Sequence, residues 1–240
     1  MERISAFHSL LHQLLPQLCL WCQLPVHQPH GLLCDHCNQA LPLMSPSAQQ
    51  VELASQQIWA FHVAGYETPW CFWLQQWKFQ QDLRCGLLLK HCFRQQCWLW
   101  QQHGLTADAV AYVPCTRQRL QQRGFNQALE LAEQAALCLQ LPLWHGLVAI
   151  SDRHQVGLNR QQRWQQSSRF AIQFDSTPRR LLLIDDVMTT GSTCHDICVQ
   201  LFAAGVRQIM VCTLLRVAPQ SRTLPLATLG KGELQRYHSD

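Results

Sequence analysis

The sequence predicts an α/β fold with a mainly parallel sheet, preceded by a small four-cysteine module. Apolar runs of strand length, such as 109–113, 181–186 and 208–215, alternate with amphipathic segments of helix length. Two cysteine pairs of matching spacing come before the first of these runs. With 240 residues, 48% of them apolar, the chain can build one substantial domain and a small module.

The cysteine module consists of two C-x2-C pairs that are separated by an eleven-residue spacer. The four residues are Cys19, Cys22, Cys34 and Cys37. Each pair places two thiolates on one side of a tight turn, and two such turns close a tetrahedral site with no open position. We therefore expect a structural Zn²⁺; an iron–sulfur cluster is the alternative, because four thiolates hold either. Thirteen cysteines without a secretion signal indicate a reducing compartment, and we expect a cytoplasmic protein.

Three regions are expected along the chain. Residues 1–48 hold an amphipathic N-terminal helix and the zinc module, since apolar residues in 1–18 recur at helical spacing and are interrupted by polar ones. Residues 49–218 form the sheet domain, and 219–240 form a weakly ordered tail. No apolar stretch is long enough to insert into a membrane. The net charge of +4 permits contact with nucleic acid without arguing for it.

The elements of the sheet domain follow from periodicity. We expect a strand over 59–63, two helices within 69–103 that break near 81–82, a strand over 109–113 and a helix over 126–139. A short strand over 148–150, a strand over 181–186, a helix from 194 to 204 and a strand over 208–215 complete the series. Because ligands bind at the carboxyl ends of parallel strands, the turns after 113 and after 184 should meet at one site.

The stretch 181–193, LLLIDDVMTTGST, is the most informative part of the chain. A buried strand pattern ends in two carboxylates, Asp185 and Asp186, which can accept hydrogen bonds from sugar hydroxyls. A small hydroxyl-rich turn then opens a helix, so that backbone N–H groups and hydroxyls face one point that suits a phosphate. The turn consists of Thr189, Thr190, Gly191, Ser192 and Thr193. Together these features describe a ribose 5-phosphate site; the alternative is a buried strand with a capped turn and two incidental acids.

A second polar segment, VPCTRQRLQQRGFNQ over 113–127, gathers Arg117, Arg119 and Arg123 in what we expect to be a short turn. Guanidinium groups hold phosphate oxygens in a forked geometry, so these arginines are candidates for binding pyrophosphate. Asn126 is the expected N-cap of the following helix. The alternative is a solvated arginine-rich loop. The polar, Arg-rich stretch 151–170 is either a closing loop that excludes water from the site or a flexible surface loop.

The stretch 181–193 closely resembles the PRPP-binding signature of type I phosphoribosyltransferases. Along the chain, the cysteine pairs, a Tyr66…Lys78-Phe79…Asp82 segment, the RGFNQ motif, the arginine loop and IDDVMTTGST occur in that order. This order resembles the ComF family, the ComFC/GntX-type proteins linked to bacterial competence and to the use of external DNA.

The resemblance implies a zinc module on a type I phosphoribosyltransferase fold that binds PRPP with Mg²⁺, and it leaves the acceptor open. If the protein is an enzyme, the resemblance implies that Asp185 and Asp186 are the catalytic pair and hold the ribose hydroxyls. The 189–193 turn would then hold the 5-phosphate, and the three arginines would bind the pyrophosphate. The alternative is a non-catalytic single-stranded-DNA-binding protein in which the PRPP site is a sensor or a relic, with Trp21 stacking on bases. A DNA-uptake helicase or other competence proteins would then be partners.

Overall fold

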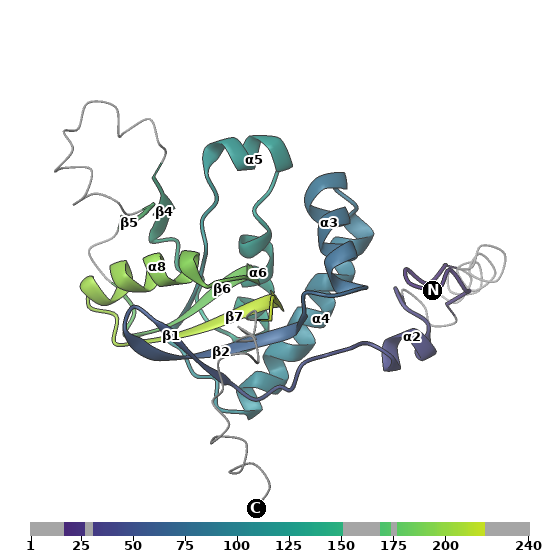
Figure 1. The fold of residues 1–240 in the computed structure, drawn as a ribbon, viewed down its shortest axis with the longest axis horizontal. Helices are drawn as coiled ribbons and strands as arrows, with labels where there is room; N and C mark the ends of the chain where they lie inside the picture. Colours follow the sequence, from purple (N-terminus) through teal and green to yellow (C-terminus); the bar gives the residue numbers. More distant parts are fainter. Residues whose placement is uncertain (1–16, 27–30, 151–168, 174–176, 219–240) are drawn as a thin grey trace, which may run out of the picture.

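A computed structural model describes residues 17–26, 31–150, 169–173 and 177–218. The predicted N-terminal helix, most of the arginine loop and the predicted tail lie outside the described residues. Figure 1 shows a twisted sheet with helices on both sides. None of the helices in the described ranges is both long and apolar enough to cross a lipid bilayer.

The central sheet has five strands in the order β1-β2-β7-β6-β3. These strands are β1 (Gln49–Leu53), β2 (Gln56–Gly65), β3 (Ala109–Tyr112), β6 (Arg180–Met188) and β7 (Gln208–Arg216). The edge strand β1 pairs antiparallel with β2, and the remaining neighbours are parallel. The mainly parallel α/β sheet that the sequence predicted is therefore confirmed.

One face of the sheet is covered by α3 (Trp70–Gln80), α4 (Leu83–Gln102) and α6 (Gln127–Leu139), which bury large aromatic and aliphatic side chains against β2, β6 and β7. Trp70, Trp73 and Trp77 of α3 are all at most 2% exposed. The break between α3 and α4 lies where the sequence placed it, because the side chain of Asp82 accepts the backbone N–H groups at the start of α4.

The other face is covered by α8 (Ser192–Ala203) and by a small antiparallel hairpin of β4 (Leu147–Ala149) and β5 (Phe170–Ile172). Ile197 and Leu201 of α8 are fully buried in the same cluster as Leu183 and Val211 of the central strands. Strands buried on both faces account for the continuous apolar runs in the sequence. The carboxyl ends of β2, β6 and β7 lie together at one end of the sheet. The loops that follow these strands face solvent there.

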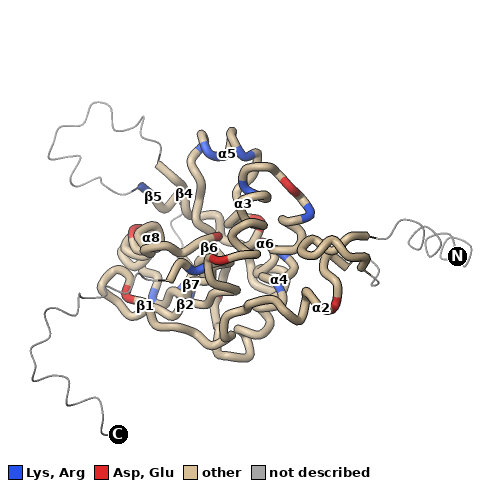
Figure 2. Tube along the Cα trace, turned by 45° about the vertical axis from the view of Figure 1, so that its right-hand side comes forward, with Lys and Arg blue, Asp and Glu red and all other residues tan. Residues whose placement is uncertain are grey.

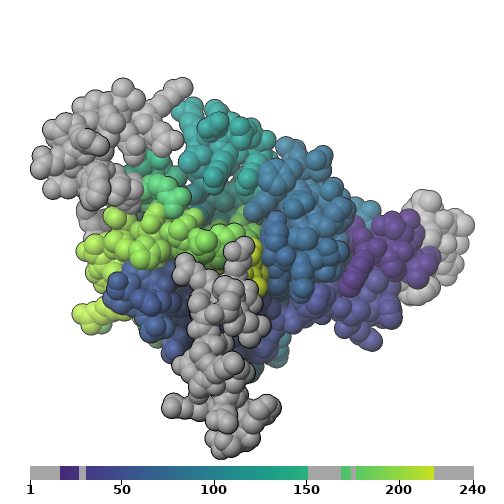
Figure 3. All heavy atoms as spheres, viewed as in Figure 1, coloured from purple at the N-terminus to yellow at the C-terminus, as the bar shows by residue number. Residues whose placement is uncertain are grey.

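The cysteine module packs directly on the sheet domain. Its short helix α2 (Asp35–Gln39) contains the last cysteine, and Cys19 and Cys37 are buried in the same apolar cluster as the tryptophans of α3. Trp21 meets Trp73 edge to face at 6.0 Å, and Arg84 of α4 donates to the carbonyl of Leu18 at 3.0 Å. Figure 3 shows this purple segment against the blue α3–α4 region. The module and α3 therefore share one core.

One local expectation was wrong, and one strand is longer than expected. The arginines after β3 lie on a helix, α5 (Arg117–Arg123), rather than in a short turn. The carboxylates Asp185 and Asp186 lie near the end of the strand, as the expected strand over 181–186 implied, but β6 continues two residues further, to Met188. The strand is longer than its apolar pattern because β6 keeps its register with β7 as far as Met188 and Arg216.

Candidate functional site

The centre of the site is the acid pair near the carboxyl end of β6. Asp185 and Asp186 are both half-buried, and the backbone N–H of Asp186 donates to Oδ1 of Asp185 at 2.8 Å. Burial raises the pKa of Asp185 well above its ordinary value and the neighbouring Asp186 raises it further, whereas the Asp186 N–H, Lys78 and Arg119 act in the opposite direction. The pair therefore resists carrying two full negative charges in the ligand-free protein.

Lys78 of α3 supplies a cation to this pair. Its Nζ lies 2.5 Å from Oδ2 of Asp186, and only 14% and 16% of the two side chains are exposed. The aromatic residues of α3 explain this placement, because burying Trp73, Leu74 and Trp77 against the core turns Lys78 toward the end of β6. An ion pair so shielded from solvent is only weakly screened by salt.

The predicted phosphate turn follows directly after β6. Thr189 and Thr190 are exposed, Gly191 has a left-handed φ of 80° as the N-cap of α8, and Ser192 and Thr193 form the first turn of the helix. A side chain at Gly191 would meet Leu53 of β1 at 3.2 Å, so glycine satisfies both the backbone angle and the space. The turn therefore places hydroxyls and backbone N–H groups at a helix N-terminus, beside the acid pair.

The helix α5 brings arginines over the same end of the sheet. Thr116 caps it and Gly124 ends it in a left-handed conformation, while Asn126 joins the carbonyl of Val113 to the first turn of α6 through its amide. Figure 2 shows the arginine positions of α5 in blue, beside the charged end of α3.

The three predicted arginines differ in what they approach. The charge of Arg119 acts on the pKa of Asp185, so Arg119 lies near the acid pair. Arg123 instead lies 5.2 Å from the centre of the Phe79 ring, and Arg117 is exposed at the start of α5. The structure thus brings Arg119 toward the acid pair and turns Arg123 toward α3.

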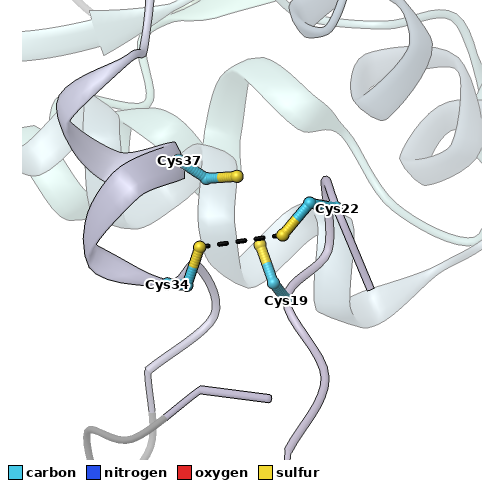
Figure 4. A group of neighbouring side chains, drawn as sticks. All are labelled: Cys19, Cys22, Cys34 and Cys37. Carbon is cyan, nitrogen blue, oxygen red and sulfur yellow. Dashed lines mark hydrogen bonds between the residues drawn. The ribbon is translucent and has the colours of Figure 1, made fainter. Parts of the chain in front are cut away.

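The four predicted metal ligands form one compact cluster. Their sulfur atoms all lie within 4.8 Å of one another, and the Cys22 and Cys34 sulfurs are 3.7 Å apart. Figure 4 shows the four sulfurs pointing toward a common centre. A tetrahedral site with Zn–S bonds of about 2.3 Å needs sulfurs about 3.8 Å apart, so the donor set fits Zn²⁺. Burial alone would raise the pKa of Cys19, but the N–H groups of Cys22, Cys34 and Trp21 lower it to about 6.

Two residues of the site were not among the predicted binding residues. Lys78 was noted only as part of a resemblance, and Arg216 at the end of β7 was not considered; its Nη1 donates to the carbonyl of Thr189 at 3.2 Å. Neither has a local sequence signal, since each depends on contacts across the sheet. Most of the Arg-rich stretch 151–170 lies outside the described residues, including Arg153, Arg160 and Arg163.

Comparison with known proteins identifies relatives that span most of the chain. Competence protein F of Haemophilus influenzae is 29% identical over 213 residues, which cover 83% of this chain and 90% of that protein. DNA utilization protein YhgH of Salmonella typhimurium is 25% identical over 228 residues, covering 84% and 97%. Competence protein ComFC of Bacillus subtilis is 34% identical over 84 residues, or 35% and 33% of the two chains. These relatives support the resemblance to the ComF family. No protein-family model matches the sequence.

Solved structures similar to this chain include an amidotransferase and a transferase whose names contain the term phosphoribosyl. One is glutamine phosphoribosylpyrophosphate amidotransferase from B. subtilis, with a TM-score of 0.41 and 19% identity, covering 54% of this chain and 26% of the other. The second is adenine phosphoribosyltransferase from Leishmania donovani, with a TM-score of 0.35 and 11% identity, covering 75% and 97%.

Proposed function

We propose that this chain is a PRPP-binding, phosphoribosyltransferase-like protein that serves competence or the use of external DNA. One observation supports the PRPP site above all others: the acid pair, the cation of Lys78 and the hydroxyl-rich turn, which come from separate elements, meet at the carboxyl end of β6. Phosphate, ribose diol and pyrophosphate are the three parts of PRPP that this set can bind. The names of the relatives supply the link to competence and DNA use.

Each group has a role that follows from its chemistry. The carboxylates of Asp185 and Asp186 accept hydrogen bonds from the ribose hydroxyls, and the N–H groups and hydroxyls of the turn 189–193 hold the 5-phosphate. Lys78, which pairs with Asp186, and Arg119, whose charge acts on Asp185, can hold the pyrophosphate. Mg²⁺, when bound, would neutralise the pyrophosphate through oxygen ligands. Transfer at C1 needs no protein nucleophile, because positioning and charge stabilisation lower the barrier.

Calorimetric titration with PRPP in the presence of Mg²⁺ tests the site directly. The wild type should bind, and replacing both carboxylates with Asp185→Asn and Asp186→Asn should weaken binding by at least about tenfold, because two charged acceptors are lost. Asp108→Asn is the matched control: it also removes a carboxylate and an ion pair, with Arg180, but at the opposite end of β6. Equal PRPP affinity for the wild type and the double variant would contradict the assignment.

Whether the bound PRPP is turned over is a separate measurement. Release of pyrophosphate from labelled PRPP, screened over nucleobases and single-stranded DNA as acceptors, would identify a transferase and its acceptor. The same screen on the Asp185→Asn/Asp186→Asn variant removes contributions from contaminating enzymes. Binding without pyrophosphate release for any acceptor would favour the sensor role.

Binding of single-stranded DNA is the second candidate, and exposed aromatic rings on α3 favour it. Phe72 and Phe79 are 51% and 62% exposed, and Arg123 lies over the Phe79 ring. Bases stack on such rings, with cations holding the backbone. Trp21 is 37% exposed and already packs against Trp73, so α3 offers the freer stacking surface. Phe79→Ala should weaken DNA binding more than PRPP binding; a gel shift showing no difference from the wild type at low salt would contradict this role.

A further inference from the structure

Arg216 is a half-buried cation at the end of β7. Its position opposite Met188 of β6 and Gly65 of β2 puts it at the same sheet edge as the acid pair. Nη1 donates to the carbonyl of Thr189, the first residue of the phosphate turn. Within the described part of the chain, it forms no ion pair; Glu67 lines the same cavity but does not pair with it. The guanidinium therefore holds the turn while its charge is left without a carboxylate.

The charge of Arg216 also has an unfavourable neighbour. The first turn of α8 starts at Ser192, and the Arg216 charge acts on Cys194 in that turn. A helix N-terminus carries a partial positive charge, so a nearby cation is destabilising by about 0.3–1 kcal/mol, whereas an anion there is stabilising. Two positive centres thus lie at the turn 189–193, and no carboxylate among the described residues forms an ion pair with Arg216.

His62 on β2 does not add a third charge to this region. Its Nδ1 lies 2.7 Å from the hydroxyl of Thr213, and that hydroxyl donates to the carbonyl of Leu215, so it must accept from Nδ1–H. The Nε2 atom consequently carries no proton in the neutral ring, and it has no partner among the described residues. Burial, together with the charge of Arg216, lowers the pKa of His62 to about 4, so at neutral pH Arg216 is the fixed cation of this region.

We propose that Arg216 positions the phosphate turn and is the fixed counter-charge for the 5-phosphate of the ligand that binds there. This inference rests on the proposed function, because it assigns a subsite within the proposed PRPP site. The unpaired charge of Arg216 destabilises the ligand-free protein, and it becomes stabilising when a phosphate dianion occupies the turn. It also divides the site: Arg216 serves the 5-phosphate, whereas Arg119 and Lys78 serve the pyrophosphate.

Calorimetry with two separate probes, ribose 5-phosphate and Mg²⁺-pyrophosphate, tests this division. Arg216→Gln should raise the Kd for ribose 5-phosphate about 10- to 30-fold, the loss expected for a charge-assisted contact, and should leave the Kd for pyrophosphate within about twofold. Arg119→Gln is the reciprocal control, with the larger effect on pyrophosphate. Thermal unfolding without ligand should show Arg216→Gln to be at least as stable as the wild type, because an unfavourable charge is removed.

The outcomes separate this inference from the proposed function. A wild type that binds neither PRPP nor ribose 5-phosphate overturns the proposed function itself. A wild type that binds both, with Arg216→Gln unchanged toward ribose 5-phosphate or equally weakened toward both probes, overturns only the role of Arg216. If Arg216→Gln does not fold, Arg216→Lys tests the role instead, because it keeps the positive charge. An affinity for ribose 5-phosphate within about fivefold of the wild type supports the role of Arg216, and a larger loss contradicts it.

Discussion

The ion pair between Lys78 and Asp186 can be tested by a double-mutant cycle of Lys78→Gln and Asp186→Asn. Removing one partner of a fully buried pair costs about 3–5 kcal/mol, because the other charge is left unpaired. Here 14% and 16% of the side chains are exposed, so we expect each single substitution to cost about 2 kcal/mol. The double variant should also cost about 2 kcal/mol instead of about 4, since no charge is stranded, which gives a coupling of about 2 kcal/mol.

Urea unfolding followed by tryptophan fluorescence measures the cycle, because three buried tryptophans lie on α3 beside Lys78. The exposed pair of Arg180 and Asp108, with side chains 46% and 38% exposed, is the control cycle and should couple by at most about 1 kcal/mol. PRPP titration of the double variant separates stability from function. The double variant should be as stable as the Asp186→Asn single variant, but its affinity for PRPP should be well below that of the wild type. Additive single effects, or a coupling no larger than in the control cycle, would refute the placement of Lys78.

Three further outcomes are expected. Cys34→Ser should lower the zinc content and destabilise the protein, whereas Cys71→Ser, outside the cluster, should not; elemental analysis that finds neither zinc nor iron in the wild type would refute a metal site. Chelation of that metal should also weaken PRPP binding, because the module supports α3, and unchanged affinity in metal-free folded protein would disprove this link. The pKa of His62 is lowered to about 4 from an ordinary 6.5, so between these pH values the unfolded chain takes up a proton at this histidine and the folded chain does not. The free energy of unfolding should therefore fall by up to about 3 kcal/mol between pH 6.5 and 4. His62→Gln should remove this part of the acid sensitivity, and identical pH profiles of stability for the variant and the wild type would contradict the assignment.

The sequence predicts what depends on contiguous residues. The run Leu181–Ile184 is fully buried in β6, and the turn at 189–193 opens α8, because an apolar strand followed by a glycine and hydroxyl turn specifies both elements locally. The four cysteines converge as predicted because C-x2-C spacing dictates local geometry. The break between α3 and α4 was predictable for the same reason, since Asp82 is a standard N-cap residue.

What the sequence did not reveal depends on partners far along the chain. Lys78 meets Asp186 across more than a hundred residues, and only the burial of α3 determines which way its side chain points. The edge strand β1 has a mostly polar pattern, QQVEL, that reads as a linker until β2 pairs with it. The helix α5 had a usable signal, because Thr116 is an N-cap, Gly124 a C-terminal cap, and Arg and Gln favour helices. A short turn was predicted instead, because the interpretation rested on the positive charge of the segment.

Helix α3 joins the two parts of the molecule that the sequence treated as separate. On one side Trp73 packs against Trp21 of the cysteine module, and five residues further along the helix Lys78 pairs with Asp186. Because buried tryptophans pack closely, a shift of the module that moved Trp73 would also move Lys78 relative to Asp186. A four-cysteine module that folds only with its metal would therefore keep the ion pair in place without contacting the ligand. This accounts for the burial of Cys19 and Cys37 in the core of the sheet domain, which an independently folding nucleic-acid-binding module would not require.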